Sequence, residues 1–323
     1  MKFILTVDTE ADNQWVPGLP ITTQNLRFIP QFQSLCDTFR IYPTYLVTSE
    51  ICDDRFAVKL LTEYWGSGRA EIGSHLHIWS TPPFEDLDGF RYNDLYHGYA
   101  NELPETMLKE KIDYLTHQFF STFGFKPTSF RSGRFGFNET CANILMQNGY
   151  LVDSSITPYI NWSKQKGLPN GTGGPNFVYE GVRPHSIRNA NGSICEIPVT
   201  ILPTRFPFTS SQRLTRLYSS LQTSMAGKIM RKITFGSQPV WFRPFPYTTI
   251  GMLHKVLKTA MEMNLECVTM MLHSSELMPG CSPYRRDQKD VDELLSLMEA
   301  LFTLLERNTI ESCTLSDVAR SMR

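Results

Sequence analysis

The sequence predicts an α/β fold built on a parallel sheet. Short apolar runs rich in β-branched and aromatic residues recur along the chain, segments with helical periodicity lie between them, and polar residues follow the apolar runs directly. Strands that alternate with helices are typical of β–α–β units with right-handed crossovers. In such folds the carboxyl ends of the strands converge on one face, where catalytic and binding residues lie.

The predicted strands are apolar runs bounded by polar or turn-forming residues. Residues 3–7 (FILTV) form the first of them and end at Asp8. Their composition and their polar boundaries are typical of a buried strand. Further core strands are predicted at residues 43–47, 70–74, 128–131, 150–152, 239–242 and 267–272.

The predicted helices are segments in which apolar residues recur at helical spacing. Leu108, Ile112, Leu115 and Phe119 form one stripe, and Gly124 follows as a C-terminal stop. Further helices are predicted at residues 253–260 after a Thr248–Thr249 cap, at 291–301 and at 314–322. Each apolar stripe is expected to pack on the sheet.

Length and composition favour one domain that spans residues 1–323. The chain has 323 residues and is 41% hydrophobic, and α/β barrels of about 200–250 residues are common as single domains. Residues 155–192 and 203–238 interrupt the alternation of strands and helices with Pro, Gly, Asn, Ser and Thr. We expect both segments to be loop insertions in this domain.

Charge and cysteine content exclude several classes of protein. The 31 basic and 32 acidic residues give a net charge of −1, which indicates neither a nucleic-acid partner nor an anionic membrane. The seven cysteines are scattered without a C-x-x-C pair, which favours a reducing compartment. The first apolar run is too short for a signal peptide, and no stretch approaches a membrane span. We expect a cytoplasmic protein without an integral membrane segment; its oligomeric state stays open.

Polar residues that suit catalysis follow six of the predicted strands. They are Asp8, Glu10 and Asp12, then His75 and His77, then Arg131 and Arg134, then Asp153, Arg243 and His273. Because the carboxyl ends of parallel strands meet on one face, we expect these side chains to form one site.

The spacing of two histidines and two acids indicates a metal site. His75 and His77 are two residues apart, so in an extended segment both point to one side and can reach one cation such as Zn²⁺. The alternative is one ligand beside a hydrogen-bonded histidine. Asp8 and Glu10 have the same spacing, and one acid can bind the metal while the other accepts a proton from water. An exposed acid cluster is the alternative for this pair.

A further histidine is a candidate proton donor. His273 follows a predicted strand, and an imidazole there can titrate near neutral pH and protonate a leaving amine. Asp153, at another strand end, is a candidate for orienting that ring. The alternatives are a core histidine bonded to backbone and a turn-forming aspartate.

Arginine and tryptophan side chains are candidates for holding the base and the substrate. Arg131 and Arg134 flank a glycine, and a guanidinium binds carboxylates as a bidentate fork. Surface ion pairs are the alternative for both. Trp79, Trp162 and Trp241 can stack on sugar faces, although tryptophans are more often core residues. Arg243 and Ser274 complete the candidate substrate-binding residues.

Several of these segments, taken in order, resemble motifs of the polysaccharide deacetylase family, also called the NodB-homology family or carbohydrate esterase family four. They are residues 6–10 (TVDTE), 71–75 (EIGSH), 130–131 (FR), 153 (D) and 272–273 (LH). The resemblance implies that Asp8 is the general base and Glu10 a metal ligand, and that Arg131 contacts the base. It also implies that Asp153 pairs with the catalytic histidine, His273, which acts as general acid.

Longer stretches look like a bacterial subgroup of this family that occurs in cell-surface polysaccharide contexts. They are residues 75–83, 129–134 and 272–280. The R-x-P-Y turn of the family's third motif is absent.

Two motifs depart from the family pattern. The family's first motif has adjacent acids, whereas Thr9 here separates the two, so the second acid is the expected ligand and Asp12 the reserve candidate. Trp79 occupies the place of the family's second histidine, and His77 is the expected substitute.

The resemblance implies a distorted, incomplete (β/α)₇ barrel that removes an N-acetyl group from an amino sugar in a saccharide or glycan precursor. A divalent metal, Zn²⁺ first with Co²⁺ or Ni²⁺ as alternatives, would bind Glu10, His75 and His77. Two other functions stay open. One is a deformylase or other amidase that acts on a lipid- or nucleotide-linked sugar. The other is a carbohydrate-binding barrel without activity.

Overall fold

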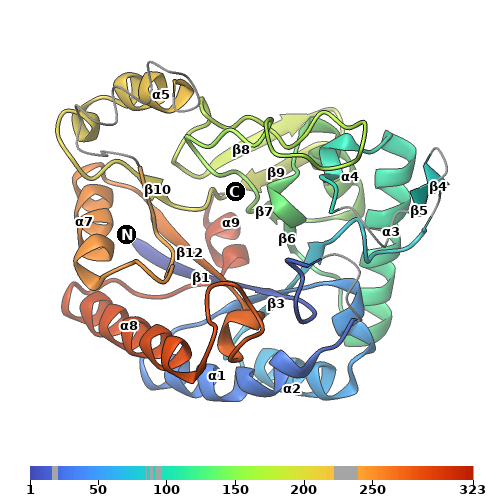
Figure 1. The fold of residues 1–323 in the computed structure, drawn as a ribbon, viewed down its shortest axis with the longest axis horizontal. Coiled ribbons are helices and arrows are strands. Elements are labelled where there is room, and N and C mark those ends of the chain that lie inside the picture. The colour runs from blue at the N-terminus through green and yellow to red at the C-terminus, as the bar shows by residue number, and fades with distance from the viewer. Residues whose placement is uncertain (17–20, 85, 88–89, 92–96, 222–238, 323) are drawn as a thin grey trace.

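The computed structural model describes residues 1–16, 21–84, 86–87, 90–91, 97–221 and 239–322. Its centre is a curled eight-stranded sheet with the order β12-β1-β2-β3-β6-β7-β9-β8 (Figure 1). These strands are β1 (Lys2–Thr9), β2 (Thr44–Val47), β3 (Glu71–Leu76), β6 (Ser129–Ser132), β7 (Val152–Asp153), β8 (His185–Asn189), β9 (Gly192–Glu196) and β12 (Cys267–His273). All neighbours from β12 to β9 pair in parallel, and β8 joins the edge as an antiparallel strand.

Helices surround the sheet (Figure 1), and all of the described helices except α5 contribute apolar residues to the core. They are α1 (Ile29–Thr38), α2 (Arg55–Gly66), α3 (Glu105–Phe123), α4 (Glu139–Asn148), α5 (Gln212–Ser220), α7 (Ile250–Glu262), α8 (Gln288–Arg307) and α9 (Leu315–Ser321). Thr249 caps α7 as expected, and Gly124 ends α3 in the left-handed region. Seven parallel strands within the described residues, with helices around them, confirm the distorted, incomplete (β/α)₇ barrel.

The central strands are buried because both faces of the sheet are covered. In β1 every residue from Phe3 to Thr9 is buried, and so is every residue of β12 before His273. This explains the continuous apolar runs, which are typical of parallel strands that lie between helices and a filled interior.

Two predicted features of the sheet differ from the structure. Residues 239–242 do not form a strand of the main sheet: β11 (Val240–Trp241) pairs antiparallel with β10 (Ile201–Leu202) in a separate two-stranded sheet. Both residues of β11 are partly exposed, as suits a strand outside the core. The hairpin of β8 and β9 was not predicted, although it begins inside the expected loop 155–192.

The open side of the barrel lies between β12 and the β8–β9 hairpin. The backbone N–H of Thr200 donates to the carbonyl of Thr269 (3.1 Å), and Phe242 donates to the carbonyl of Thr200 (2.8 Å). Residues next to β10 and β11 therefore border β12 without forming a regular strand of the sheet. A second two-stranded sheet consists of β4 (Asp86–Leu87) and β5 (Phe90–Arg91).

The second predicted insertion, residues 203–238, contains α5, while its residues 222–238 lie outside the described part. None of the described helices combines the length and apolar character that a membrane span requires.

Candidate active site

The fold brings the predicted strand-end residues together at the carboxyl ends of neighbouring strands. Asp8 and His273 are directly opposite each other in the pairing of β1 with β12. His75 and Arg131 are opposite each other in the pairing of β3 with β6. Glu10 lies one residue beyond β1. The local register alone therefore places five functional side chains on one face.

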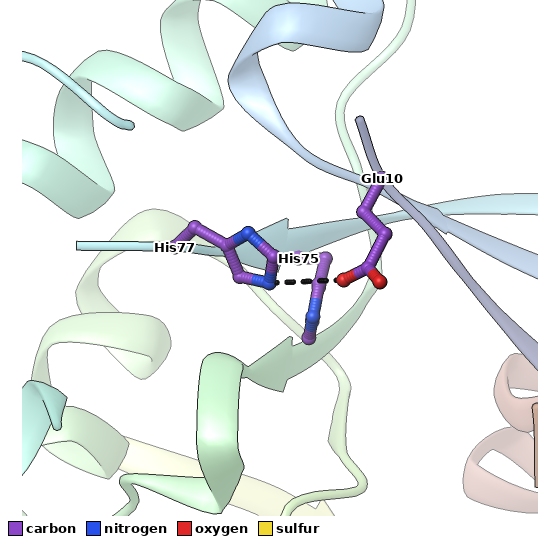
Figure 2. Close-up of side chains that lie close together, drawn as sticks. All are labelled: Glu10, His75 and His77. Carbon is purple, nitrogen blue, oxygen red and sulfur yellow. Dashed lines mark ion pairs between the residues drawn. The ribbon is translucent and has the colours of Figure 1, made fainter. Parts of the chain in front are cut away.

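Glu10, His75 and His77 form a buried group that could hold a metal ion. Their ligand atoms lie within 4.8 Å of one another, and all three side chains are buried. Figure 2 shows the Glu10 carboxylate directed at the imidazoles, with Glu10 Oε2 3.3 Å from His77 Nε2. His77, the expected substitute for the family's second histidine, thus lies in the same group as His75.

The surroundings of His75 and His77 favour the neutral imidazole, which can offer a nitrogen lone pair to a metal ion. His75 Nδ1 lies 2.9 Å from the carbonyl oxygen of Arg131, so Nδ1 carries the proton and Nε2 keeps its lone pair. Burial lowers the pKa of His75 and of His77 to about 4. The ring of Trp79 stacks on His77 at 4.2 Å between centroids. Both imidazoles are therefore uncharged at neutral pH.

The carboxyl group of Glu10 is buried with too little positive charge nearby to stabilise its ionised form. Burial raises the pKa of Glu10 to about 7, and the charges of His273 and His75 only partly offset this. Its side chain contacts His77 and, at 3.4 Å, the hydroxyl of Ser275. A divalent cation would supply the missing charge, so the residues present fit a metal ion with nitrogen and oxygen ligands.

Asp8 is held as an ion by a fully buried arginine. Arg131 Nη1 donates to Asp8 Oδ1 at 2.6 Å, and the same guanidinium donates to the carbonyl and hydroxyl of Ser154. Burial alone would raise the pKa of Asp8, but the charge of Arg131, with those of His75 and His273, lowers it to about 2. The other oxygen, Oδ2, lies 4.0 Å from Nε2 of His75 and 4.0 Å from Nε2 of His273.

His273 is fixed by Glu276 and Arg243. Its Nδ1 lies 3.1 Å from Glu276 Oε1 and 2.9 Å from Arg243 Nη2, which itself donates to Glu276 Oε1. The backbone N–H of His273 also donates to Glu276. Burial would raise the pKa of Glu276, but Arg243 and His273 outweigh it and lower the pKa to about 2. The ring nitrogen that remains, Nε2, faces Asp8.

Asp153 does not take the place that the resemblance implied. Its carboxylate oxygens accept hydrogen bonds from the N–H and the hydroxyl of Ser155, at 2.9 and 2.8 Å. Its neighbour across the sheet is Glu196 on β9. Burial raises the pKa of Asp153 and, together with the nearby Asp153, that of Glu196. The partner of the His273 imidazole is Glu276, three residues along the same chain segment.

A cavity of about 580 Å³ opens beside these residues. Aromatic side chains line it around the group of Glu10, His75 and His77. One set consists of Trp15 and Tyr284, and the other of Trp79, His97, Tyr99, Phe135 and Trp162. The edge of Trp15 lies 5.0 Å from the His273 ring, and Arg243 lies over the Tyr284 ring at 4.9 Å. The cavity thus combines flat apolar walls with the polar group at its base.

Two predicted substrate-binding residues line this cavity, but their polar atoms have partners in the protein. Trp79 stacks between His77 and His97, and its indole N–H donates to Gln14. Arg134 donates to the carbonyl oxygens of His97 and Lys166 and to the Tyr99 hydroxyl. These bonds hold loops at the edge of the cavity.

Other predicted residues lie behind or beside the cavity. Ser274 is fully buried and exchanges hydrogen bonds with the backbone of Glu10, so it joins the ends of β1 and β12 and does not face a substrate. Trp241 contacts Phe135 and Trp162 from the rim.

Asp12, the reserve ligand, lies outside the metal-ligand group. Its carboxylate accepts hydrogen bonds from Asn25, Thr22 and the backbone of Gln24. It therefore organises the loop after β1.

Residues in loops also contribute to the candidate site, and they were not predicted from the sequence. Trp15, His97 and Tyr284 carry no strand-end signal, because they lie in irregular segments. Glu276 had a usable signal: an acid three residues after a strand-end histidine forms a capping box, in which it accepts the histidine N–H.

Comparisons with known proteins show the fold. The sequence matches no protein-family model and no curated protein. Among solved structures, a candidate polysaccharide deacetylase from Mycobacterium smegmatis is similar over 99% of this chain and 90% of that chain, at 13% identity and a TM-score of 0.55. The chain has the polysaccharide deacetylase fold.

Sugar-transferring enzymes share this fold. A 4-alpha-glucanotransferase from Thermococcus litoralis matches 100% of this chain and 38% of its own, at 10% identity and a TM-score of 0.50. A glycoside hydrolase family 57 branching enzyme from Thermococcus kodakaraensis matches 98% of this chain and 70% of its own, at 11% identity and a TM-score of 0.50. Because one fold carries different reactions, the side chains must decide the chemistry.

Proposed function

We propose that this protein is a metal-dependent hydrolase that removes an N-acetyl group from an amino sugar in a saccharide or glycan precursor. One observation carries the proposal: an ionised carboxylate, Asp8, lies between a buried metal-binding group and a second histidine. Its Oδ2 is 4.0 Å from Nε2 of His75 and equally far from Nε2 of His273. Amide hydrolysis needs a base for water on one side of the carbonyl and an acid for the nitrogen on the other.

Glu10, His75 and His77 would hold the metal ion. Three protein ligands leave a coordination position open, as in catalytic zinc sites, and their nitrogen and oxygen donors also suit Co²⁺ or Ni²⁺. When bound, such an ion would polarise the amide carbonyl and lower the pKa of a water molecule.

Asp8 would accept the proton of the attacking water. Its low pKa keeps it ionised throughout the neutral range. Arg131 restrains Oδ1 and leaves Oδ2 toward the cavity. As the water oxygen bonds to the amide carbon, one proton passes to Asp8 and the carbon–nitrogen bond becomes the bond to break.

His273 would protonate the leaving nitrogen. An arginine N–H can only donate, so Nδ1 of the neutral ring accepts from Arg243 and Nε2 carries a proton toward the cavity. In the imidazolium form Nδ1–H donates to Glu276 instead. The imidazolium form is the acid: its Nε2–H passes to the leaving nitrogen, the ring stays neutral with Nδ1–H on Glu276, and the products are acetate and a free amine.

The cavity supports a saccharide substrate. Its aromatic walls offer flat faces of the kind that stack on sugar rings, and its volume of about 580 Å³ accommodates a small-molecule ligand. The seven cysteines all have free thiols, which supports the proposal that the protein acts in the cytoplasm, where precursors are made.

The test is metal-dependent release of acetate from N-acetylated oligosaccharides. We expect activity that disappears with a chelator and returns with Zn²⁺, Co²⁺ or Ni²⁺. Asp8→Asn and His273→Ala should each lower kcat by about 10²- to 10⁴-fold, the usual contribution of one acid or base. The matched controls are Asp292→Asn and His254→Ala, which change an exposed acid and an exposed histidine on helices.

Three results would contradict the proposal in different ways. Release of formate in place of acetate would favour the deformylase. Purified protein without stoichiometric metal and without turnover would favour the binding barrel. Unchanged acetate release by Asp8→Asn would exclude this mechanism.

An enzyme that cleaves glycosidic bonds is a second candidate. Its fold occurs in a branching enzyme, and the pKa values of Asp8 and Glu10 diverge to about 2 and about 7, as in an acid and nucleophile pair. Chelation separates the two candidates, because cleavage by two carboxylates would survive removal of the metal.

A further inference from the structure

The near-zero net charge of the chain conceals a strong separation of charge along the sequence. Residues 197–261 contain nine Lys or Arg residues and no Asp or Glu, whereas the rest of the chain has 22 basic and 32 acidic residues. The second insertion, residues 203–238, lies within this basic segment. Charge blocks of one sign often mark an interaction with a partner of opposite charge.

Within this segment, α5 is oriented with its apolar side toward solvent. Leu214 and Leu217 are 43% and 54% exposed, while Thr215, Tyr218 and Ser219 face the protein and are buried. A helix that only covers a core has the opposite arrangement. The two leucines lie three residues apart, so they form one patch on the helix surface.

Further residues extend the patch and give it positive charge. Arg213 is exposed on the same helix, one residue before Leu214. Phe206, which precedes the helix, is 82% exposed. We call Phe206, Arg213, Leu214 and Leu217 the α5 surface. Its three apolar side chains together with the positive charge of Arg213 are typical of a helix that binds at a membrane interface.

The segment that carries the α5 surface ends at a strand that borders the cavity wall. It connects β10 to β11, and Trp241 on β11 contacts Phe135 and Trp162, two residues of the cavity wall. In Figure 1 α5 projects at the periphery of the molecule, beyond β10 and away from the sheet.

We propose that the α5 surface docks on an anionic lipid bilayer. Basic residues are attracted to anionic headgroups, and exposed Leu and Phe side chains enter the boundary between headgroups and acyl chains. A second copy of this chain fits less well, because two basic segments repel each other. A soluble polyanion would use the arginines but leave the leucines and Phe206 in water. The docking is independent of the proposed reaction; a lipid-linked sugar as substrate would rest on the proposed function.

The experiment is cosedimentation of the full chain with lipid vesicles. We expect binding to vesicles of phosphatidylcholine with about one third phosphatidylglycerol, weak binding to phosphatidylcholine alone, and loss of binding at high salt. Arg213→Glu, and separately the double change Leu214→Ser with Leu217→Ser, should each weaken binding by about tenfold. The matched controls, Arg55→Glu on α2 and Phe120→Ser on α3, change exposed residues on other helices and should bind as the wild type does.

Other occupants of the surface give different results. Absence of binding to anionic vesicles overturns the proposal. So does binding that Arg213→Glu weakens but the serine changes leave intact, since that result indicates a polyanion site. A concentration-dependent dimer that the serine changes dissociate would identify a second copy. A large loss of thermal stability in the serine variant would show that the leucines are covered within the chain. Because vesicle binding needs no turnover, failure here leaves the proposed function untouched.

Discussion

Two pairs of buried carboxyl groups lie at the carboxyl ends of the same sheet, yet the pKa values of their carboxyl groups are shifted in opposite directions. At the ends of β1 and β12, Asp8 and Glu276 are ionised, and the pKa of each is lowered to about 2. At the ends of β7 and β9, burial raises the pKa of Asp153 and raises that of Glu196 far more. All four side chains are buried at 2% exposure or less.

The difference comes from the arginines. Arg131 pairs with Asp8 at 2.6 Å, and Arg243 pairs with Glu276 at 2.9 Å, whereas Asp153 and Glu196 face each other across neighbouring strands. Two acids in contact cannot both ionise easily in a low dielectric, so one keeps its proton. Position at a strand end therefore does not predict whether a buried carboxyl group is ionised; a buried cation beside it does.

The largest effect is expected when one of these cations is removed. Arg243→Met leaves the Glu276 carboxylate buried without its arginine, which should lower the free energy of unfolding by about 3–5 kcal/mol at neutral pH. Urea denaturation measures this cost. The matched control is Arg286→Met, which breaks an exposed pair with Asp290 and should cost less than about 1 kcal/mol. Equal costs for the two variants would contradict the role given to Arg243.

Glu196, the acid that keeps its proton, should respond to substitution in the opposite direction. The raised pKa of Glu196 means that its contribution to stability is complete below the unfolded-state pKa and is lost as pH rises through the folded-state pKa. Glu196→Gln, which does not titrate, should thus match the wild type near pH 4 and become the more stable protein at higher pH, by up to about 1.4 kcal/mol for each pH unit.

Urea denaturation at several pH values tests this expectation. Glu299→Gln, a change of an exposed acid on α8, is the control and should show no such trend. A Glu196→Gln variant that loses stability at neutral pH would indicate that the carboxyl is ionised and paired.

Most of the sheet could be predicted from the sequence, because buried parallel strands leave a strong signal. The apolar runs at 3–7 and 267–272 lie in β1 and β12, and polar residues directly after them reach the site as expected. The β8–β9 hairpin was missed because half of its residues are exposed and its apolar content is low. Asn191–Gly192 at its turn, with Gly192 at φ 131°, was the signal that could have found it.

Candidate site residues at strand ends could be predicted from the sequence, whereas those in loops mostly could not. The grouping of Glu10, His75 and His77 could be predicted from their spacing at strand ends, since neighbouring parallel strands keep a fixed register. The orientation of His273 was assigned to Asp153 by resemblance, but which acid reaches a ring depends on side-chain contacts in three dimensions. Glu276 is close in sequence and reaches it through a single 3₁₀ turn, Ser274–Leu277.

The smallest effect on activity is expected for substitution of Asp153. Comparison with substitution of Glu276 shows which of the two acids supports His273. Asp153→Asn keeps an oxygen that accepts from Ser155 and does not touch His273, so kcat and its pH profile should change by less than about fivefold. Glu276→Gln removes the charge that stabilises the His273 imidazolium and should lower kcat by about tenfold or more and move the pH profile. Both variants are compared in acetate release, with circular dichroism as the check on folding.

A hundredfold loss of activity in a folded Asp153→Asn protein, with Glu276→Gln nearly unaffected, would restore the role that the resemblance gave to Asp153. The opposite result would show that the acid supporting His273 lies in the turn after β12, where the arginine of the ionised pair also binds.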